Sequence, residues 1–150
     1  MTDRIDKAIL RNLEQDGRMS FNALSEKINL SKTPSWTRVQ ALEREGVITG
    51  YRAMLSPERL GLELQAFVQA RVASERCRDF EAAVMRNGSV LACYAMTGEA
   101  DYLLQVLVEN VAALDDLVRN RISIMPGVKG VLTLVVLKKI KDHGLISDCL

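Results

Sequence analysis

The spacing of apolar residues changes near residues 57–61, and this change constrains the fold more than any other feature of the chain. Before residue 57, apolar side chains recur every three or four residues, as on one face of an amphipathic helix. After residue 61 they alternate with polar residues, as in a strand buried on one face. The 150 residues are enough for two small domains. We therefore expect a helical domain at residues 1–55, a linker at 56–63 and a second domain at 64–150.

The first domain is predicted to contain three helices and a wing. The helices are expected within residues 3–17, 20–27 and 31–46, because each range begins with a capping residue and carries apolar residues at helical spacing. In the third helix, Trp36, Val39 and Leu42 are expected to face the core. Residues 47–55 place β-branched side chains around Gly50, which favours a small hairpin. This layout is that of a winged helix-turn-helix, whose last helix enters the major groove of DNA.

The second domain is predicted to be ferredoxin-like. Strands are expected at residues 64–72, 90–97, 102–108 and 131–140, with one helix around Phe80 that ends at Asn87 and another at 111–122. The resulting order, β-α-β-β-α-β, is that of an antiparallel sheet with both helices on one face. The whole chain is therefore expected to be an α+β protein.

That sheet has more apolar surface than its helices can cover. Residues 131–140 are apolar on both faces, and two helices bury only one of them. The other face would leave an apolar patch in water, made of Phe67, Leu103, Leu107, Leu132 and Leu134. We expect a second copy of the sheet to cover it, so a homodimer is predicted.

Composition excludes several classes of protein. Lys and Arg number 20 and Asp and Glu number 19, so an argument for nucleic-acid binding must rest on local pattern. The longest largely apolar stretches, 102–108 and 131–137, are far shorter than the roughly 20 residues that span a bilayer. With a charged amino terminus, this predicts a cytoplasmic protein without a membrane partner. Three cysteines and a single histidine, His143, offer no metal site or catalytic triad, so we expect no cofactor and no enzyme.

The third predicted helix begins with hydroxyl, amide and cationic side chains. Such groups bond phosphates and base edges, and a helix amino terminus itself favours a phosphate. Residues 27–52 contain five basic and two acidic residues, a local excess of +3. A face that is merely solvated is the alternative interpretation. The candidate DNA-binding residues are Ser31, Lys32, Thr33, Ser35, Thr37, Arg38 and Gln40.

A second candidate site lies in the turn between the two middle strands, Gly98-Glu99-Ala100-Asp101. Asp101 at the strand end would hold the ammonium group of a ligand, while nearby backbone amides would bind a carboxylate. An ordinary acidic turn residue is an equal alternative.

Four motifs carry a resemblance to a known family. Residues 6–18 (DKAILRNLEQDGR), 30–51 (LSKTPSWTRVQALEREGVITGY), 97–102 (TGEADY) and 126–137 (PGVKGVLTLVVL) resemble the Lrp/AsnC family, the feast/famine regulators of bacteria and archaea. The resemblance covers about residues 3–141. It implies that the first domain binds double-stranded DNA and that residues 31–42 form the recognition helix, with the DNA contacts made by Lys32, Thr33, Ser35, Thr37, Arg38 and Gln40. Because a symmetric dimer presents two such helices, we expect a palindromic operator. One departure lies around Trp36, where family members with this pattern commonly carry cysteine and then lysine and this chain has Ser35 and Thr37. At Thr37 the cation of a phosphate contact is therefore missing.

The resemblance also implies that the second domain forms homodimers, often assembled into octamers, and binds a small effector, usually an amino acid, at the junction between dimers. Carried over to this chain, the effector pocket is lined by Gly98, Glu99, Ala100, Asp101, Tyr102, Thr133, Leu134, Val135 and Val136. An architectural DNA-binding protein without an effector is the alternative. The tail at residues 142–150 extends beyond the resemblance and is expected to be a surface extension.

Overall fold

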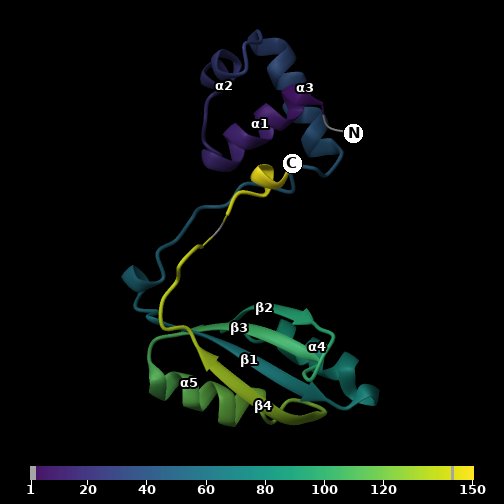
Figure 1. Cartoon of the computed structure of the whole chain (residues 1–150), viewed down its shortest axis with the longest axis vertical. Coiled ribbons are helices and arrows are strands. Elements are labelled where there is room, and N and C mark those ends of the chain that lie inside the picture. Colours follow the sequence, from purple (N-terminus) through teal and green to yellow (C-terminus); the bar gives the residue numbers. More distant parts are fainter. Residues whose placement is uncertain (1–2, 143) are drawn as a thin grey trace. The chain divides into compact units, whose positions relative to one another are not determined.

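The computed structural model describes residues 3–142 and 144–150 in two compact units. The first unit contains the chain up to Met54 together with Ile140–Leu150, and the second contains Leu55–Lys139 (Figure 1). The tail thus belongs with the first unit, although the sequence analysis assigned it to the second. Met1, Thr2 and His143, the single histidine considered above, lie outside the described residues.

The first unit is built from α1 (Arg4–Gln15), α2 (Phe21–Lys27) and α3 (Lys32–Arg44). The predicted side-chain caps of α1 and α2 are confirmed, whereas Ser31 occupies the N-cap position of α3 without a side-chain capping hydrogen bond. Asp3 accepts hydrogen bonds from the backbone N–H groups of Ile5 and Asp6, and Asp6 accepts one from the backbone of Asp3 in return. Ser20 accepts one from Ala23. Between α2 and α3, the positive φ of Asn29 makes the tight turn of a helix-turn-helix. The buried core of the three helices contains Ile9, Leu24, Val39 and Leu42.

Two predictions for this unit are wrong. Trp36 does not face the core, since 49% of its surface is exposed, and Ser35 is buried in its place. Residues 47–55 form no strand, so the wing is not a hairpin. The first residues of this segment terminate α3. The N–H groups of Val47 and Ile48 both donate to the carbonyl of Leu42, and Ile48 packs on the core. An isolated two-stranded hairpin is marginally stable, and residues 49–55 have no regular secondary structure here.

The second unit confirms the ferredoxin-like prediction. The 3₁₀ turn η1 (Glu58–Leu60) leads into β1 (Leu64–Val72), and η2 (Ser74–Arg76) leads into α4 (Cys77–Met85). They are followed by β2 (Val90–Ala95), β3 (Tyr102–Val108), α5 (Val111–Leu117), a π-helical turn (Val118–Ile122) and β4 (Val128–Val135). The strands pair antiparallel in the order β2-β3-β1-β4. β2 and β4 end earlier than predicted, and β4 begins three residues earlier, because its pairing with β1 starts at Val128.

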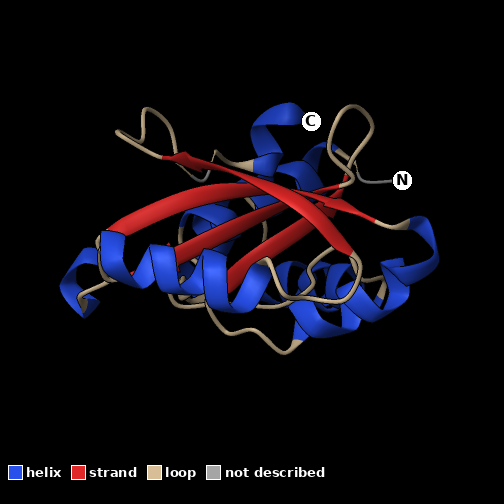
Figure 2. Cartoon of the chain, turned by 90° about the horizontal axis from the view of Figure 1, so that it is seen from below, coloured by secondary structure: helices blue, strands red, loops and turns tan. Residues whose placement is uncertain are grey.

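Helices α4 and α5 cover the same face of this sheet (Figure 2). Their apolar residues Phe80, Val84, Leu114 and Leu117 pack with alternate residues of the strands in a single core. In the two central strands, β1 and β3, the residues on this face are buried apart from Leu64 at the start of β1, as the alternation of residues 64–72 predicted. This face of the sheet therefore forms the core of the second unit.

The opposite side, which we call the open face, is covered by no helix of the second unit among its described residues. The strand pairing puts Phe67 between Gln105 and Leu134, Gln69 between Leu103 and Leu132, and Tyr94 opposite Leu103. The open face consists of Gln65, Phe67, Gln69, Tyr94, Leu103, Gln105, Leu107, Leu132 and Leu134. Leu132 and Leu134 expose 56% and 46% of their surface. An apolar surface that water reaches to this extent is typical of an interface.

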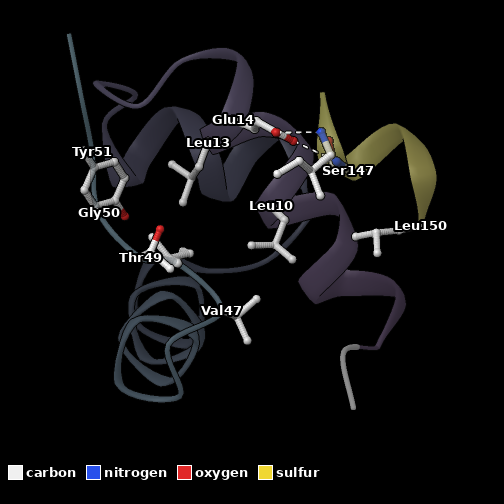
Figure 3. Close-up of a pocket in the computed structure, with 11 residues that line it drawn as sticks. Leu10, Leu13, Glu14, Val47, Thr49, Gly50, Tyr51, Ser147 and Leu150 are labelled. Carbon is white, nitrogen blue, oxygen red and sulfur yellow. Dashed lines mark hydrogen bonds between the residues drawn. The ribbon is translucent and has the colours of Figure 1, made fainter. Parts of the chain in front are cut away.

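The tail docks on α1 within the first unit (Figure 3). It ends in η4 (Ile146–Cys149). The carboxylate of Glu14 accepts the backbone N–H groups of Ile146 and Ser147, at 2.7 and 2.9 Å, at the start of this turn. Lys7 donates to a main-chain oxygen of Leu150, at 3.1 Å. Together α1, residues 47–51 and the tail enclose an apolar pocket of about 320 Å³ that includes Leu10 and Leu13. The tail is therefore a packed element, which corrects the prediction of a surface extension.

Glu14→Gln is expected to release the tail. An amide has one acceptor oxygen and no charge, so it cannot replace a carboxylate that accepts two N–H groups. The hydrogen bonds from Ser147 and from Ile146 lower the pKa of Glu14. The stability gained from docking is therefore fully present above the ordinary carboxyl pKa and is lost as the pH falls through the lowered pKa. Hydrogen exchange at the amides of Ile146 and Ser147 measures the release.

Exchange at these two amides should accelerate in Glu14→Gln and remain unchanged in Glu26→Gln, which alters an exposed carboxylate on α2. Equal protection in all three proteins would contradict the assigned role of Glu14.

Candidate DNA interface and effector site

One side of α3 is exposed and polar. Its exposed side chains recur at helical spacing and are Lys32, Thr33, Trp36, Thr37, Gln40 and Arg44. Four of the predicted DNA-binding residues lie in this stripe, Lys32, Thr33, Thr37 and Gln40, and Ser31 is exposed at its amino-terminal end. The stripe can therefore offer an ammonium, hydroxyls and an amide to one ligand surface. Thr37 bonds to the carbonyl of Thr33, and Gln40 donates to Glu43 on the next turn.

Ser35 lies on the other side of α3 and does not belong to this stripe. Its side chain is fully buried, and its hydroxyl donates to the carbonyl of Ser31 at 2.9 Å. Burial of a serine is tolerated because that hydrogen bond satisfies the hydroxyl. The structure therefore corrects its inclusion among the DNA-binding residues, since no ligand outside the protein can reach it.

Arg38 is half-buried at the junction of α3 with α1. Its Nη1 lies 2.7 Å from Asp3 Oδ2 and 2.8 Å from Asp6 Oδ1. The pKa of the Asp3 carboxyl is lowered by the backbone N–H of Asp6 and by the Arg38 guanidinium. The pKa of Arg38 is raised by the same two acids, Asp3 first. Asp3 and Asp6 lie at the start of α1, outside residues 27–52, for which the local charge was counted. They neutralise a cation that the sequence analysis assigned to DNA binding.

We expect Arg38→Ala and Asp6→Asn both to weaken DNA binding severalfold and to lower the melting temperature. Arg38→Ala removes the link between α3 and the start of α1 that orients the exposed stripe, and Asp6→Asn weakens it, because one of the two ion pairs of Arg38 is lost. DNA binding is measured by fluorescence anisotropy at several salt concentrations, and unfolding by circular dichroism. A direct phosphate contact by Arg38 predicts the opposite for Asp6→Asn: the freed cation would strengthen binding and steepen its dependence on salt. That result would contradict the positioning role.

A polar hollow of about 630 Å³ lies at one end of the open face. It is lined by Gln69, Arg71, Glu99, Ala100, Gly130, Val131 and Leu132. Gly130 is opposite Arg71 in the strand register, and a Cβ there would lie 3.2 Å from the guanidinium nitrogen Nη2. The absence of a side chain at Gly130 thus leaves room for Arg71. The hollow presents a cation, an anion and an amide beside apolar surface, and its size is within the roughly 300–1,000 Å³ of small-molecule sites.

Part of the predicted effector turn reaches this hollow. Glu99 and Ala100 line it, and the positive φ of Gly98 makes the turn that brings them there. Asp101 holds the turn against β1: its Oδ2 accepts the N–H of Val72 at 2.7 Å, and its own N–H bonds to Ala70.

Tyr102 lies on the other side of the sheet. It is buried against Phe80, with ring centroids 4.8 Å apart, and donates to Glu81 at 2.7 Å. That hydrogen bond and burial raise the pKa of Tyr102. Its side chain is therefore part of the core within one chain.

The predicted second wall, Thr133–Val136, does not come to the turn in a single chain. Thr133 pairs with Val68 and Leu134 with Phe67, whereas the turn joins β1 at Ala70. At about 3.3 Å per residue, this puts Thr133 to Val136 roughly 7–17 Å along β1 from Ala70. Thr133 and Val135 also share a face with the core residues Val68 and Ala66, while Leu134 is on the open face. A pocket lined by both the turn and Thr133–Val136 therefore requires that these residues come from a second chain.

Three residues that the sequence analysis did not select stand out in the structure. Gln69 and Arg71 line the hollow, and Trp36 is on the exposed stripe of α3. Gln69 and Arg71 could have been found from the sequence. They are polar residues on the face of β1 where the neighbouring strands β3 and β4 carry leucines. For Trp36 the spacing was ambiguous: Ser35 and Trp36 both fit the helical period of Val39 and Leu42, and hydropathy favoured the wrong one.

The remaining described residues add two observations. No three His, Cys, Asp or Glu side chains within residues 3–142 and 144–150 come together as metal ligands. Every helix in the same ranges is too short or too polar to cross a bilayer.

A helix-turn-helix unit joined to a ferredoxin-like unit with a polar hollow defines a class, the DNA-binding regulators with a ligand-binding domain. Comparison with known families agrees. A winged helix-turn-helix DNA-binding family matches residues 2–49, and the Lrp/AsnC ligand binding domain matches residues 65–146. The chain belongs to the Lrp/AsnC family of transcriptional regulators.

Individual relatives are similar over nearly the whole chain. The Bkd operon transcriptional regulator of Pseudomonas aeruginosa is 39% identical, covering 92% of each chain. The leucine-responsive regulatory protein of Escherichia coli K12 is 38% identical over 95% of this chain and 88% of its own. Among solved structures, the L-Met complex of a transcriptional regulator from Neisseria meningitidis is 36% identical, has a TM-score of 0.94, and covers 97% of this chain and 96% of its own.

Proposed function

We propose that this chain is a homodimeric transcriptional regulator that binds a palindromic operator through α3 and responds to an amino acid bound at the hollow. The observation that carries the proposal is that a cation, Arg71, and an anion, Glu99, both line one polar hollow. A free amino acid carries a carboxylate and an ammonium, and a site with one cation and one anion complements both charges.

The remaining lining indicates which amino acids suit the hollow. Ala100, Val131 and Leu132 contribute apolar surface, and Gln69 contributes an amide. An aliphatic or thioether side chain would bury against this surface without leaving a charge unpaired. The complex of the Neisseria regulator with L-Met supports an effector of this type. Of the residues assigned from the resemblance, Glu99 and Ala100 are kept at this site, and Gly98 and Asp101 are proposed to shape the turn.

DNA binding is proposed for the exposed stripe of α3 with the adjacent Ser31. Lys32 supplies the cation for a phosphate, and Thr33, Thr37 and Gln40 supply groups that bond phosphates or base edges. Two copies related by a twofold axis would enter successive major grooves about 34 Å apart, which explains why a palindromic operator is expected.

The homodimer is proposed to form through the open face, whose leucines and Phe67 would otherwise remain in water. Assembly of dimers into octamers, which the resemblance implies, is part of the same proposal, and a neighbouring chain would then bring Thr133–Val136 toward the turn. Effector binding would regulate DNA binding if the amino acid has different affinities for these assemblies.

The proposal is tested by measuring DNA affinity with and without each of the twenty amino acids. The duplexes are first selected from a random pool by the protein. We expect affinity to fall steeply with salt, because phosphate contacts release counterions. We also expect one chemical class of amino acid to change the affinity by about 5–150-fold, the usual range of allosteric coupling. Specific DNA binding that no amino acid alters would favour an architectural protein and overturn the effector part. Absence of saturable DNA binding would overturn the whole proposal.

A further inference from the structure

Trp36 is exposed in the second turn of α3, and the fold of the first unit does not explain an apolar side chain at this position. It is the single tryptophan of the chain, and 49% of its surface faces water. Among the described residues the Trp36 side chain makes no hydrogen bond and no ring contact. Exposing the large apolar area of an indole to water is unfavourable. The core of the first unit is formed by other residues, so Trp36 does not contribute to it.

The surroundings of Trp36 indicate what covers it. On a helix the neighbours of residue 36 are residues 32, 33, 39 and 40. Val39 is buried in the core, whereas Lys32, Thr33 and Gln40 are exposed, as is Thr37 on the same stripe. An ammonium, two hydroxyls and an amide around an apolar plate do not suit the apolar core of a protein interface. They do suit the major groove, which is lined by phosphates and by base edges with both polar groups and methyl groups.

We propose that Trp36 determines sequence preference by packing its indole against the C5-methyl group of a thymine in the major groove. This inference rests on the proposed binding of DNA through α3. Trp36 is in the second turn of α3 (Lys32–Arg44), and the amino-terminal part of a recognition helix is the part that contacts base edges. The thymine methyl is the apolar group that a major groove offers to a side chain. Stacking on a base face would require unstacking the duplex, which costs a few kcal/mol.

Single replacements of thymine by deoxyuridine test this directly, because they remove only the methyl group. Duplexes selected by the unchanged protein are resynthesised with one deoxyuridine at a time. At one or two positions in each half-site, binding by the unchanged protein should weaken about fourfold, the factor expected for one buried methyl group. Trp36→Ala should bind these duplexes and the parent duplex equally, and Trp36→Phe should retain part of the difference.

A matched control separates this inference from DNA binding itself. Lys32→Ala should weaken binding to every duplex and reduce the salt slope by about one, while keeping the thymine preference. The intrinsic fluorescence of Trp36 provides a readout without mutation, since the chain has one tryptophan, and its emission should change more with the selected duplex than with a scrambled one. Circular dichroism melting confirms that Trp36→Ala is folded.

The inference is overturned if deoxyuridine has the same effect on the unchanged protein and on Trp36→Ala, or no effect on either, while both bind DNA. Failure of the unchanged protein to bind any duplex would overturn it together with the proposed function.

Discussion

Leu134→Asp is expected to convert the proposed dimer into a folded monomer in size-exclusion chromatography with light scattering. Leu134 is opposite Phe67 on the open face and exposes 46% of its surface in the single chain, so an aspartate there remains solvated and the monomer should fold. In the proposed dimer the same carboxylate would be buried against leucines without a partner. An unpaired buried charge costs several kcal/mol, which is comparable with the whole stability of many interfaces.

Val111→Asp is the matched control for this prediction. Val111 is also an exposed apolar residue of the second unit, with 70% of its surface in water, but it is in the first turn of α5, on the covered side of the sheet. An acid at the start of a helix is favourable. This variant should remain dimeric and melt at a temperature close to that of the unchanged chain. A dimeric Leu134→Asp protein would show that the open face is not the interface.

Arg71→Ala is expected to remove most of the stabilisation of the protein by its proposed amino-acid effector. The unchanged chain is screened by thermal unfolding against the twenty amino acids, and a ligand at 100 times its Kd should add about 2.7 kcal/mol. Loss of a charge-assisted hydrogen bond costs about 1.5–3 kcal/mol, so at the same concentration the variant should keep only about 0.3–1.3 kcal/mol of this stabilisation. Glu99→Gln should lose the shift as well, because it no longer offsets the charge of the ammonium group.

Two controls make this result specific. Arg78→Ala removes an exposed arginine on α4, away from the hollow, and should respond to the effector as the unchanged chain does. Asp101→Ala should lower the melting temperature without effector, because the N–H of Val72 loses its acceptor. If Arg71→Ala retains the full shift, the carboxylate of the effector is bound elsewhere.

The strongest predictions came from local pattern. The alternation of Ala66, Val68 and Ala70 with polar neighbours identified β1 and its buried face, and the caps Asp3 and Ser20 identified where α1 and α2 begin. These features depend on residues close together in the chain, so the sequence contains the whole signal. The four motifs likewise identified the family, which the comparisons confirm.

The errors arose where a distant part of the chain determined the outcome. Trp36 and Ser35 fit the same helical period, and only the packing of three helices decided which one was buried. Arg38 appeared to be a free cation until Asp3 and Asp6 were brought beside it from α1. The effector turn was found from its motif, but its partners Gln69, Arg71 and Gly130 come from two other strands.

The sequence by itself determined the two kinds of secondary structure, the order of the elements, the family and the apolar surplus of one sheet face. Tertiary structure alone decided which polar groups come together: Arg71 and Glu99 line one hollow, Arg38 forms ion pairs with two acids, and Glu14 accepts hydrogen bonds from the tail. The reason is physical. Hydrophobic burial depends on periodicity, which a short segment expresses, whereas hydrogen bonds and ion pairs require specific atoms within about 3 Å, and strand register and helix packing set those distances.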